Sequence, residues 1–351
     1  MKRIIIVTEF FDNPIDEGIK KSVYNLYQNL SVDNDVRVVC RNGSESDSIY
    51  VCNTNRLFLS KKLYNYISLF SPDYLIYFPF QSSTFASFVR NKILKALSGN
   101  IKTLFIALQP KKLNIIENIL LNFLKPDIVL TSSLQLSKFL KKNNIKTELI
   151  PQYTKLDKFY KLRENFEINL LRNKYNLKTK KKIISHVGHL RNSRNLDSLI
   201  NIQRAGHQVL IISSTSTPGS SNSKFQIEKD KLKLRLRAEG IIIIENYIQN
   251  INEIYQLSDV YVFPVIEPNA CIDLPLSILE ARACGIPCVC TNFGSISHFL
   301  GKDHEGIRYS EINKFNDNID FFLNSKRTYY KSKVNQLNHD FINLISNHLH
   351  N

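Results

Sequence analysis

Short apolar runs rich in β-branched residues alternate with longer segments of helical periodicity along the chain. The runs predict two series of buried β-strands, one at residues 3–8, 36–40, 74–78, 103–108 and 127–131 and the other at residues 182–187, 208–213, 240–244, 259–263 and 287–291. Helical periodicity lies between them, for example at residues 19–30, 84–97, 133–143, 195–205 and 274–284. This alternation indicates parallel sheets that are covered by helices on both faces.

Because the series occurs twice, the sequence predicts an α/β protein with two Rossmann-like, doubly wound parallel-sheet domains facing a cleft. We expect the first domain at residues 1–150 and the second at residues 151–325. The polar, basic segment 151–181 begins the second domain as its connection to the first. A C-terminal helix within residues 326–351 is expected to pack back on the first domain.

The composition of the 351 residues fits a globular protein, because 43% are hydrophobic and only 11 are Gly and 11 are Pro. No apolar run is long enough for a membrane-spanning helix, and the N-terminus predicts a buried strand in place of a secretory signal. Cys284, Cys288 and Cys290 could be taken for a metal cluster, but their helix–Gly–strand context favours burial as small core residues. Six cysteines in so long a chain predict no disulfide framework, which fits a cytoplasmic protein.

The formal charge of +16 is unevenly spread. Residues 1–50 carry 6 basic and 8 acidic side chains, whereas residues 51–150 carry 14 and 4. The excess is consistent with a solvated helix face, an anionic membrane surface or a phosphate-bearing substrate. We see no zinc-finger spacing, RNP signature or heptad-bearing basic region, so we expect no nucleic-acid partner. The candidate acceptor or membrane patch consists of Lys61, Lys62, Lys111 and Lys112.

Two loops that follow predicted strands are candidate anion sites. In the second domain a buried strand leads to Gly188, then to His189, Arg191 and Arg194, and then to a predicted helix. Backbone amides at a helix start, together with guanidinium groups, bind anions. In the first domain the loop through Gly18 leads into a helix in the same way.

One carboxylate is out of place in the otherwise apolar helix at residues 274–284. Glu280 would cost several kcal/mol there as an unpaired ion. Arg282 is two residues away and so lies on another face of the helix, which makes a pair with Glu280 poor. We therefore expect Glu280 to accept hydrogen bonds from vicinal hydroxyls of a ligand, with Asp273 and Glu267 in the preceding loop within reach of the same ligand.

These motifs resemble the family 4 retaining glycosyltransferases of the two-Rossmann-domain (GT-B) fold, also called glycosyl transferases group 1. The resemblance covers both domains and is stronger in the second. The longest match to the family pattern PLxxLEAMACGxPVV is residues 275–289, and a second, to SDVFVxP, is residues 258–264. Gly188-His189-Leu190, followed by Arg194, matches the phosphate loop, whereas residues 150–159 and Glu17–Gly18 are weaker echoes of the interdomain strand and of the N-terminal Gly-Gly loop.

The resemblance implies roles for single residues. Glu280 would hold the ribose of a nucleotide-sugar donor, Arg194 would stabilise the leaving diphosphate, and Gly18 would let the first-domain loop approach it. The donor is a nucleotide-diphosphate sugar, with a UDP-sugar favoured and a GDP-sugar as the alternative, and neither metal nor bound cofactor is expected. The candidate catalytic residues are Arg194, Glu280, Asp273 and Gln109. The candidate donor-binding residues are Gly18, Gly188, His189, Arg191, Arg194, Glu267, Asp273, Leu274 and Glu280.

Three positions depart from the family pattern. His189 replaces an Arg in the phosphate loop, Ile272 stands where the family has a first Glu, and Gln109 stands where a His often touches the donor sugar or the acceptor. Arg191 is a candidate to compensate for the lost cation, and Asp273 or Glu267 for the lost carboxylate.

The resemblance predicts a retaining hexosyltransferase that moves sugar to a hydroxyl of a glycan or lipid-linked, anionic acceptor in the synthesis of surface polysaccharide or glycolipid. It would act in the cytoplasm, with peripheral contact to the inner face of the membrane. Two alternatives remain open: a degenerate, non-catalytic nucleotide-sugar-binding scaffold, and another GT-B-type enzyme such as a phosphorylase or epimerase.

Overall fold

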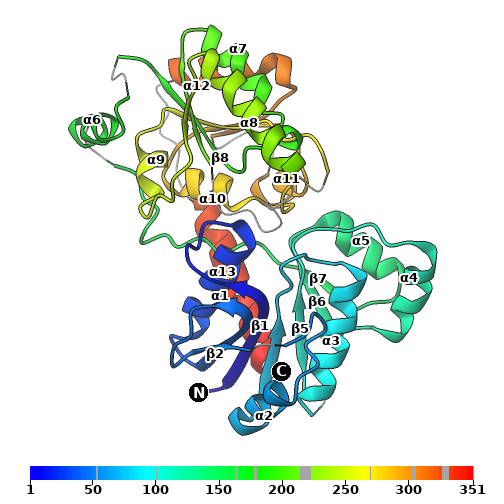
Figure 1. Cartoon of the computed structure of the whole chain (residues 1–351). Coiled ribbons are helices and arrows are strands. Elements are labelled where there is room, and N and C mark those ends of the chain that lie inside the picture. Colours follow the sequence, from blue (N-terminus) through cyan, green and yellow to red (C-terminus); the bar gives the residue numbers. More distant parts are fainter. Residues whose placement is uncertain are drawn as a thin grey trace. The chain divides into compact units, whose positions relative to one another are not determined.

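The computed structural model divides into two compact units (Figure 1). It describes residues 1–350 except 53, 100, 163–164, 178–179, 214–222, 269, 302–305 and 326–331. The first unit is Met1–Tyr153 with Cys271–Leu274 and His339–Asn351, and the second is Thr154–Ala270 with Pro275–Asn338.

The first unit is built on a seven-stranded parallel sheet in the order β3-β2-β1-β4-β5-β6-β7. Its strands are β1 (Arg3–Phe11), β2 (Asp35–Gly43), β3 (Ile49–Val51), β4 (Tyr74–Tyr77), β5 (Thr103–Ile106), β6 (Ile128–Thr131) and β7 (Thr147–Leu149). The central strands are mostly apolar and almost entirely buried, which is typical of strands covered on both faces.

Helices cover both faces of this sheet. They are α1 (Gly18–Leu30), α2 (Lys61–Phe70), α3 (Phe85–Leu97), α4 (Ile115–Leu120) with the short helix η1 (Leu121–Phe123), α5 (Leu134–Lys142) and the end of α13 (Ser332–His350). One face packs against α1 and α13, and the other packs against α2, α3, η1 and α5. One core contains the buried leucines of α3, η1 and α5, which are Leu94, Leu121, Leu136 and Leu140.

The second unit has a six-stranded parallel sheet in the order β10-β9-β8-β11-β12-β13. Its strands are β8 (Ile183–Val187), β9 (Gln208–Ile212), β10 (Ile242–Ile244), β11 (Val260–Phe263), β12 (Cys288–Cys290) and β13 (Ile307–Tyr309). Its helices are α6 (Asn165–Lys174), η2 (Asn192–Arg194), η3 (Leu196–Ser198), α7 (Leu199–Arg204), α8 (Ser223–Ala238), α9 (Asn252–Gln256), α10 (Leu276–Ala283), α11 (Ile296–Leu300), η4 (Ile312–Lys314) and α12 (Phe315–Asn324).

The prediction of two Rossmann-like, doubly wound parallel sheets is confirmed. The three-residue strands β3, β7 and β13 were not predicted. The helix expected at residues 195–205 is wrong in its first half. Asn195 adopts a left-handed φ of 55°, and the chain passes through η2 and η3 before α7 begins.

The C-terminal helix was expected within residues 326–351, of which 326–331 and 351 lie outside the described residues. The last part of α13 packs back on the first sheet, where Phe341, Ile345 and Leu349 join the core that also holds α1.

A four-residue segment, Cys271–Leu274, is separated from its flanks and belongs to the first unit. The sequence places it in a loop of the second domain. The structure packs Ile272 into the core of the first unit, where the side chain is 8% exposed. Residues predicted in this segment to touch a donor therefore lie in the first unit.

Cys284, Cys288 and Cys290 are buried, as the sequence predicted. Burial raises the pKa of the Cys288 thiol to about 12, which keeps this thiol protonated. Among the described residues, no helix combines the length and the apolar character that crossing a bilayer requires.

Candidate functional site

The loop after β8 packs tightly around Gly188. The Gly188 N–H donates to the Ile212 carbonyl at 2.9 Å and so extends the β8–β9 ladder. A Cβ added to Gly188 would lie 3.0 Å from His186 Nε2 and 3.3 Å from the Arg194 guanidinium. Glycine is therefore needed here so that the Arg194 side chain can lie against the end of the strand.

Arg194 is 8% exposed, and its Nε has no hydrogen-bond partner in the described part of the chain. A buried guanidinium nitrogen without a partner is costly, because its N–H loses its hydrogen bond to water and gains none from the protein. An anionic ligand at this loop would supply that hydrogen bond. Arg194 is thus well suited to the role predicted for it.

His186 precedes this loop and is fully buried. Its Nδ1 lies 3.0 Å from the Val262 carbonyl, and its Nε2 has no partner among the described residues. Burial, helped by the charge of Arg194, lowers the pKa of His186 to about 4, although the hydrogen bond with the Val262 carbonyl acts to raise it. The imidazole is therefore neutral at pH 7, so Arg194 carries the positive charge of this pair.

The other two basic positions of the loop differ in their surroundings. The Arg191 guanidinium lies 4.8 Å from the ring centre of Phe225 on α8, which is a cation–π contact. His189 is partly buried beside Arg191 in sequence. Arg191 was predicted to compensate for the cation lost at position 189. In the structure its guanidinium is stacked on an aromatic ring.

Glu280 lies on α10, is 4% exposed and accepts a hydrogen bond of 2.7 Å from the Tyr255 hydroxyl. Tyr255, on α9, is fully buried. Burial and then the nearby Glu280 charge raise the pKa of Tyr255 well above its usual range, so the phenol keeps its proton and donates. Arg282 points elsewhere and donates to the Ile286 carbonyl at 3.1 Å. The carboxylate is thus held by a partner that the sequence analysis did not find.

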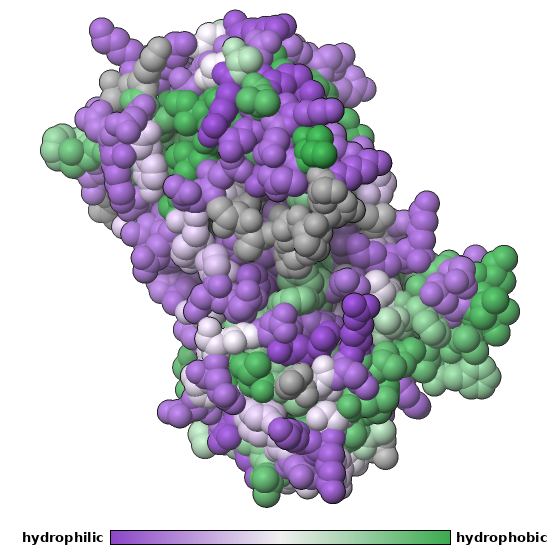
Figure 2. Space-filling model, in the orientation of Figure 1, coloured by the Kyte–Doolittle hydropathy of each residue, from purple (hydrophilic) through white to green (hydrophobic). Residues whose placement is uncertain are grey.

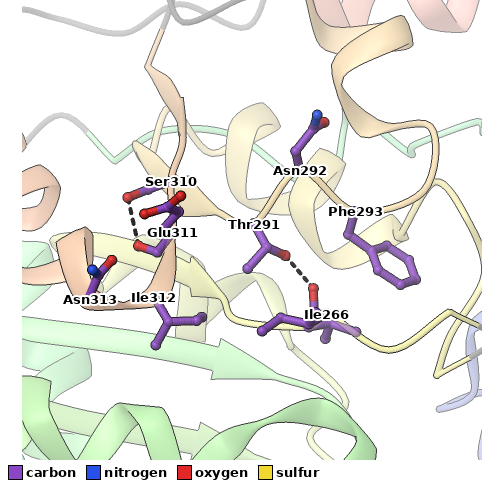
Figure 3. A pocket seen from close by; sticks show the side chains of 9 residues that line it. Ile266, Thr291, Asn292, Phe293, Ser310, Glu311, Ile312 and Asn313 are labelled. Carbon is purple, nitrogen blue, oxygen red and sulfur yellow. Dashed lines mark hydrogen bonds between the residues drawn. The ribbon is translucent and has the colours of Figure 1, made fainter.

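A cavity of about 460 Å³ opens at the carboxyl ends of β11, β12 and β13 (Figure 3). In parallel sheets of this kind, ligands bind at this edge. The lining comes from three loops: Val265 and Ile266, then Thr291, Asn292 and Phe293, then Ser310, Glu311, Ile312 and Asn313. The Thr291 hydroxyl donates to the Val265 carbonyl and so ties two of these loops together.

The sequence analysis missed every residue of this lining. The signal was partly available, because polar Thr291 ends the predicted strand 287–291 and Asn292 directly follows it. The third loop follows β13, which was not predicted. The predicted residue Glu267 is exposed next to this lining, and its carbonyl accepts from the Ala270 N–H at 3.2 Å.

Gln109 was predicted to touch the donor sugar or the acceptor. In the structure its side chain is hydrogen-bonded to residues of the first unit. Its Nε2 donates to the Cys271 carbonyl at 2.8 Å, and its Oε1 accepts from Lys111 Nζ at 3.0 Å. Its backbone carbonyl accepts from the hydroxyls of Ser82 and Ser83. Gln109 thus anchors the segment Cys271–Leu274.

Asp273 completes that anchor. Its carboxylate accepts from the Ser133 hydroxyl at 2.5 Å, and its N–H donates to the Leu108 carbonyl at 3.2 Å. Burial raises the pKa of Asp273 to about 6, although the Ser133 hydrogen bond and the charge of Lys111 act to lower it. Leu274, also predicted at the donor, is fully buried.

Gly18 begins α1, but the helix start is already capped. Glu17 accepts from the Ile19 and Lys20 amides at 2.8 and 3.1 Å. These are the amides that the sequence analysis assigned to a phosphate. The nearest atom to a Cβ added at Gly18 is Ile272 Cδ1 at 3.5 Å.

The four predicted patch lysines do not share one environment. Lys61 and Lys62 are exposed at the start of α2, and Lys112 is exposed before α4. Lys111 is partly buried against Gln109, and this burial lowers the pKa of its ammonium group. In the described part of the chain, no group of His, Cys, Asp and Glu side chains is arranged to hold a metal ion.

Comparison with known proteins identifies the second half of the chain. The sequence profile of the family described as glycosyl transferases group 1 matches residues 167–339. This segment of the chain is similar to that family. The matched region contains Gly188, Arg194 and Glu280, together with the motifs at residues 258–264 and 275–289. No curated protein has a matching sequence.

Solved structures extend the likeness to the whole chain. HepE from Anabaena, in complex with UDP and glucose, has a TM-score of 0.73 at 12% identity, with 99% of this chain and 100% of that chain covered. Sucrose-phosphate synthase from Thermosynechococcus elongatus has a TM-score of 0.72 at 16% identity, with 100% and 98% covered. WaaG, a glycosyltransferase involved in lipopolysaccharide biosynthesis, has a TM-score of 0.60 at 12% identity, with 97% and 95% covered. The fold is GT-B.

Proposed function

We propose that this protein is a retaining, metal-independent hexosyltransferase that uses a nucleotide-diphosphate sugar. The observation that carries the proposal is the buried Arg194, whose Nε lacks a partner in the described residues, within the loop that leads out of β8. A diphosphate leaving group gains negative charge in the transition state, and a prearranged guanidinium stabilises that charge. Gly188 keeps the space that lets Arg194 lie there.

Glu280 holds the ribose of the donor in this proposal. The Tyr255 hydroxyl fixes one carboxylate oxygen of Glu280, so the carboxylate is oriented before the ligand binds. Vicinal hydroxyls suit a carboxylate because each O–H can donate to it. A UDP-sugar is the favoured donor, because HepE was solved with UDP and with UDP-glucose; a GDP-sugar is the alternative.

The acceptor is a hydroxyl of a glycan or of a lipid-linked, anionic molecule, as in the synthesis of surface polysaccharide or glycolipid. The excess of basic side chains in residues 51–150 supports an anionic acceptor. The acceptor oxygen attacks the anomeric carbon on the face from which the diphosphate leaves, so configuration is retained. We place the enzyme in the cytoplasm, in peripheral contact with an anionic membrane face.

The decisive experiment measures ligand-induced shifts of the unfolding temperature with UDP, GDP, ADP, CMP and their common sugar conjugates. A ligand that binds only the folded state raises that temperature. We expect a shift with one nucleoside diphosphate that is lost in Glu280→Gln and kept in Glu239→Gln, whose carboxylate pairs with Arg204 at the surface. No shift with any nucleotide would refute the donor site.

Two other functions are separated by product analysis. A degenerate scaffold is favoured by His189 and Ile272, which depart from the family pattern. It would bind a nucleotide yet neither transfer the sugar nor hydrolyse the donor. A phosphorylase would need free phosphate, and an epimerase would change the donor sugar without any acceptor. Transfer that requires an acceptor hydroxyl supports the proposal, and nuclear magnetic resonance of the new linkage reports whether the configuration is retained.

A further inference from the structure

The short helix α4 and the turn η1 that follows it turn their apolar side outward. Five large apolar side chains within nine residues are 42–80% exposed: Ile115, Ile116, Ile119, Leu120 and Phe123. Figure 2 shows apolar side chains gathered in the region where Figure 1 draws α4. We call these five residues the α4 patch.

The α4 patch is one surface because of helical spacing. Ile115 and Ile119, and Ile116 and Leu120, are four residues apart, so each pair lies on one side of the helix. The polar residues Glu117 and Asn118 between them are partly buried. An ordinary surface helix has the opposite arrangement, with the apolar stripe against the core.

The side of this segment that faces the core of the first unit already makes apolar contacts. Leu121 is buried in the core of the first unit, and Leu113 and Leu124 pack against the same core. The five exposed side chains are therefore additional to those that hold the segment in place. Contiguous exposed apolar surface of this kind marks a site of contact with another molecule or with a membrane.

The charge around the patch points to an anionic partner. Residues 85–142, which run from α3 to α5, contain ten Lys and Arg but only two Asp and Glu. Both acids are engaged: Asp127 pairs with Lys95, and Glu117 accepts from the Asn114 N–H at 2.8 Å. On α5, the spacing of Lys138, Lys141 and Lys142 puts three exposed ammonium groups on one side of the helix.

We propose that the α4 patch inserts into the interface of an anionic lipid membrane, with the lysines before it and on α5 contacting the headgroups. Helices that lie in the plane of a membrane interface combine apolar side chains, which enter the lipid, with nearby lysines, which contact the headgroups. A protein partner with a dry apolar site would not need the surrounding excess of positive charge. This inference deepens the membrane contact in the proposed function and does not depend on the nucleotide site.

The chain contains no tryptophan, so one substitution gives a direct probe. Phe123→Trp places a fluorophore in the patch, and Leu234→Trp places one on α8 at a side chain that is 70% exposed. We expect the emission of Phe123→Trp to shift to shorter wavelength with vesicles of two parts phosphatidylcholine to one part phosphatidylglycerol, and less with pure phosphatidylcholine. Leu234→Trp should not respond to either.

Binding itself is measured by vesicle flotation of the full chain. We expect Ile116→Ser/Phe123→Ser to bind the mixed vesicles at least about tenfold more weakly than the unchanged protein, and Leu234→Ser to bind equally. The unfolding temperature of each variant, with and without the nucleotide that shifts it, separates loss of membrane contact from loss of folding or of the donor site.

Three results would overturn the inference. The first is that the unchanged protein floats with neither kind of vesicle, and the second is that the double variant floats as well as the unchanged protein. A blue shift of Phe123→Trp that grows with protein concentration in the absence of lipid, together with a dimer in light scattering, would assign the patch to a second copy of the chain.

Discussion

In the first unit the side-chain amide of Gln109 is bonded at both ends, whereas in the second unit the similarly buried Arg194 leaves its Nε without a partner among the described residues. Their exposed fractions are 7% and 8%. Both residues follow strands of parallel sheets, and both were predicted from the sequence to face a ligand. Burial and position therefore do not separate them, and hydrogen bonding does.

The difference indicates what each sheet edge is built to do. The hydrogen bonds of Gln109 and Asp273 fix the segment Cys271–Leu274, and the Glu17 carboxylate accepts hydrogen bonds from the first amides of α1. In the second unit, His186 Nε2 and Arg194 Nε are both buried without a partner in the described residues. Unsatisfied buried polar groups persist where a ligand completes them. At the first edge these residues thus act as a structural anchor, whereas the two unpartnered atoms at the second are what the proposed anion site requires.

The largest expected effect comes from Arg194→Met. We expect kcat/KM for the donor to fall by about 10² to 10³, because one prearranged cation is lost. The free energy of unfolding should stay equal or rise, because a buried charge without a counter-charge is removed. Steady-state kinetics and chemical denaturation measure the two quantities.

Arg172→Met is the matched control. Arg172 is also 8% exposed, but it donates to Asp259 at 2.7 Å. Its loss should lower the free energy of unfolding by about 3 kcal/mol and leave nucleotide affinity nearly unchanged. If Arg194→Met were instead the more destabilising of the two, the contrast between the two edges would fail.

Asp273 gives the next largest effect, and it appears in stability. Its pKa in the folded protein is about 6 against 3.8 for the free group, so folding favours the protonated acid. The folded state binds the extra proton between pH 4 and 6, so stability falls as pH rises through this window, by about 3 kcal/mol. Above pH 6 the buried carboxylate is ionised, so its contribution to the free energy of unfolding stays lower than at pH 4 by this amount.

Asp273→Asn tests this directly. The variant keeps an oxygen to accept from Ser133, so we expect higher stability than the unchanged protein at pH 7 and equal stability near pH 4. Urea denaturation across pH 4 to 7 measures the difference. A slope over this window that is the same in both proteins would show that Asp273 is not the group responsible.

Tyr255→Phe should have a smaller effect, on ligand affinity. It removes the hydroxyl that orients Glu280, and the loss of one hydrogen bond to a charged group corresponds to about a tenfold weaker nucleotide affinity. Tyr261→Phe is the control, because Tyr261 is equally buried and donates to Ser277 at 2.8 Å. Isothermal titration with the preferred nucleotide should separate the two variants, and equal losses would argue against an orienting role for Tyr255.

The smallest effect is expected at Gly18. A methyl group there meets only Ile272 Cδ1 at an ordinary 3.5 Å, so Gly18→Ala should change kcat/KM by less than about twofold. Gly188→Ala should lower it about tenfold, because the new Cβ would crowd His186 and Arg194. A strong loss in Gly18→Ala would restore the predicted approach of this loop to the diphosphate.

Much of the fold could be predicted because the apolar runs are long where the sheets are buried. Residues 259–263 and 274–284 coincide closely with β11 and α10, and Glu280 was found because a carboxylate contrasts with its apolar helix.

Other features depend on contacts between distant residues. Nothing near Asp273 in the sequence indicates that its segment packs with Leu108 and Ser133, more than a hundred residues earlier. The partner of Glu280 is 25 residues away, and the left-handed Asn195 has no local signature that separates it from a helix start. Tertiary packing decides such features, and the local pattern of residues in a single sequence does not reveal that packing.

The segment Cys271–Leu274 also limits how this protein can be divided or recombined. The chain passes from one unit to the other at residues 153, 270, 274 and 338, so neither unit is a continuous stretch of sequence. A fragment of residues 154–338 would carry Ile272 without the core that buries it. Exchange of residues 154–338 between homologues would likewise bring in four residues fitted to a different first unit. In this chain the two units are therefore expected to be inherited together.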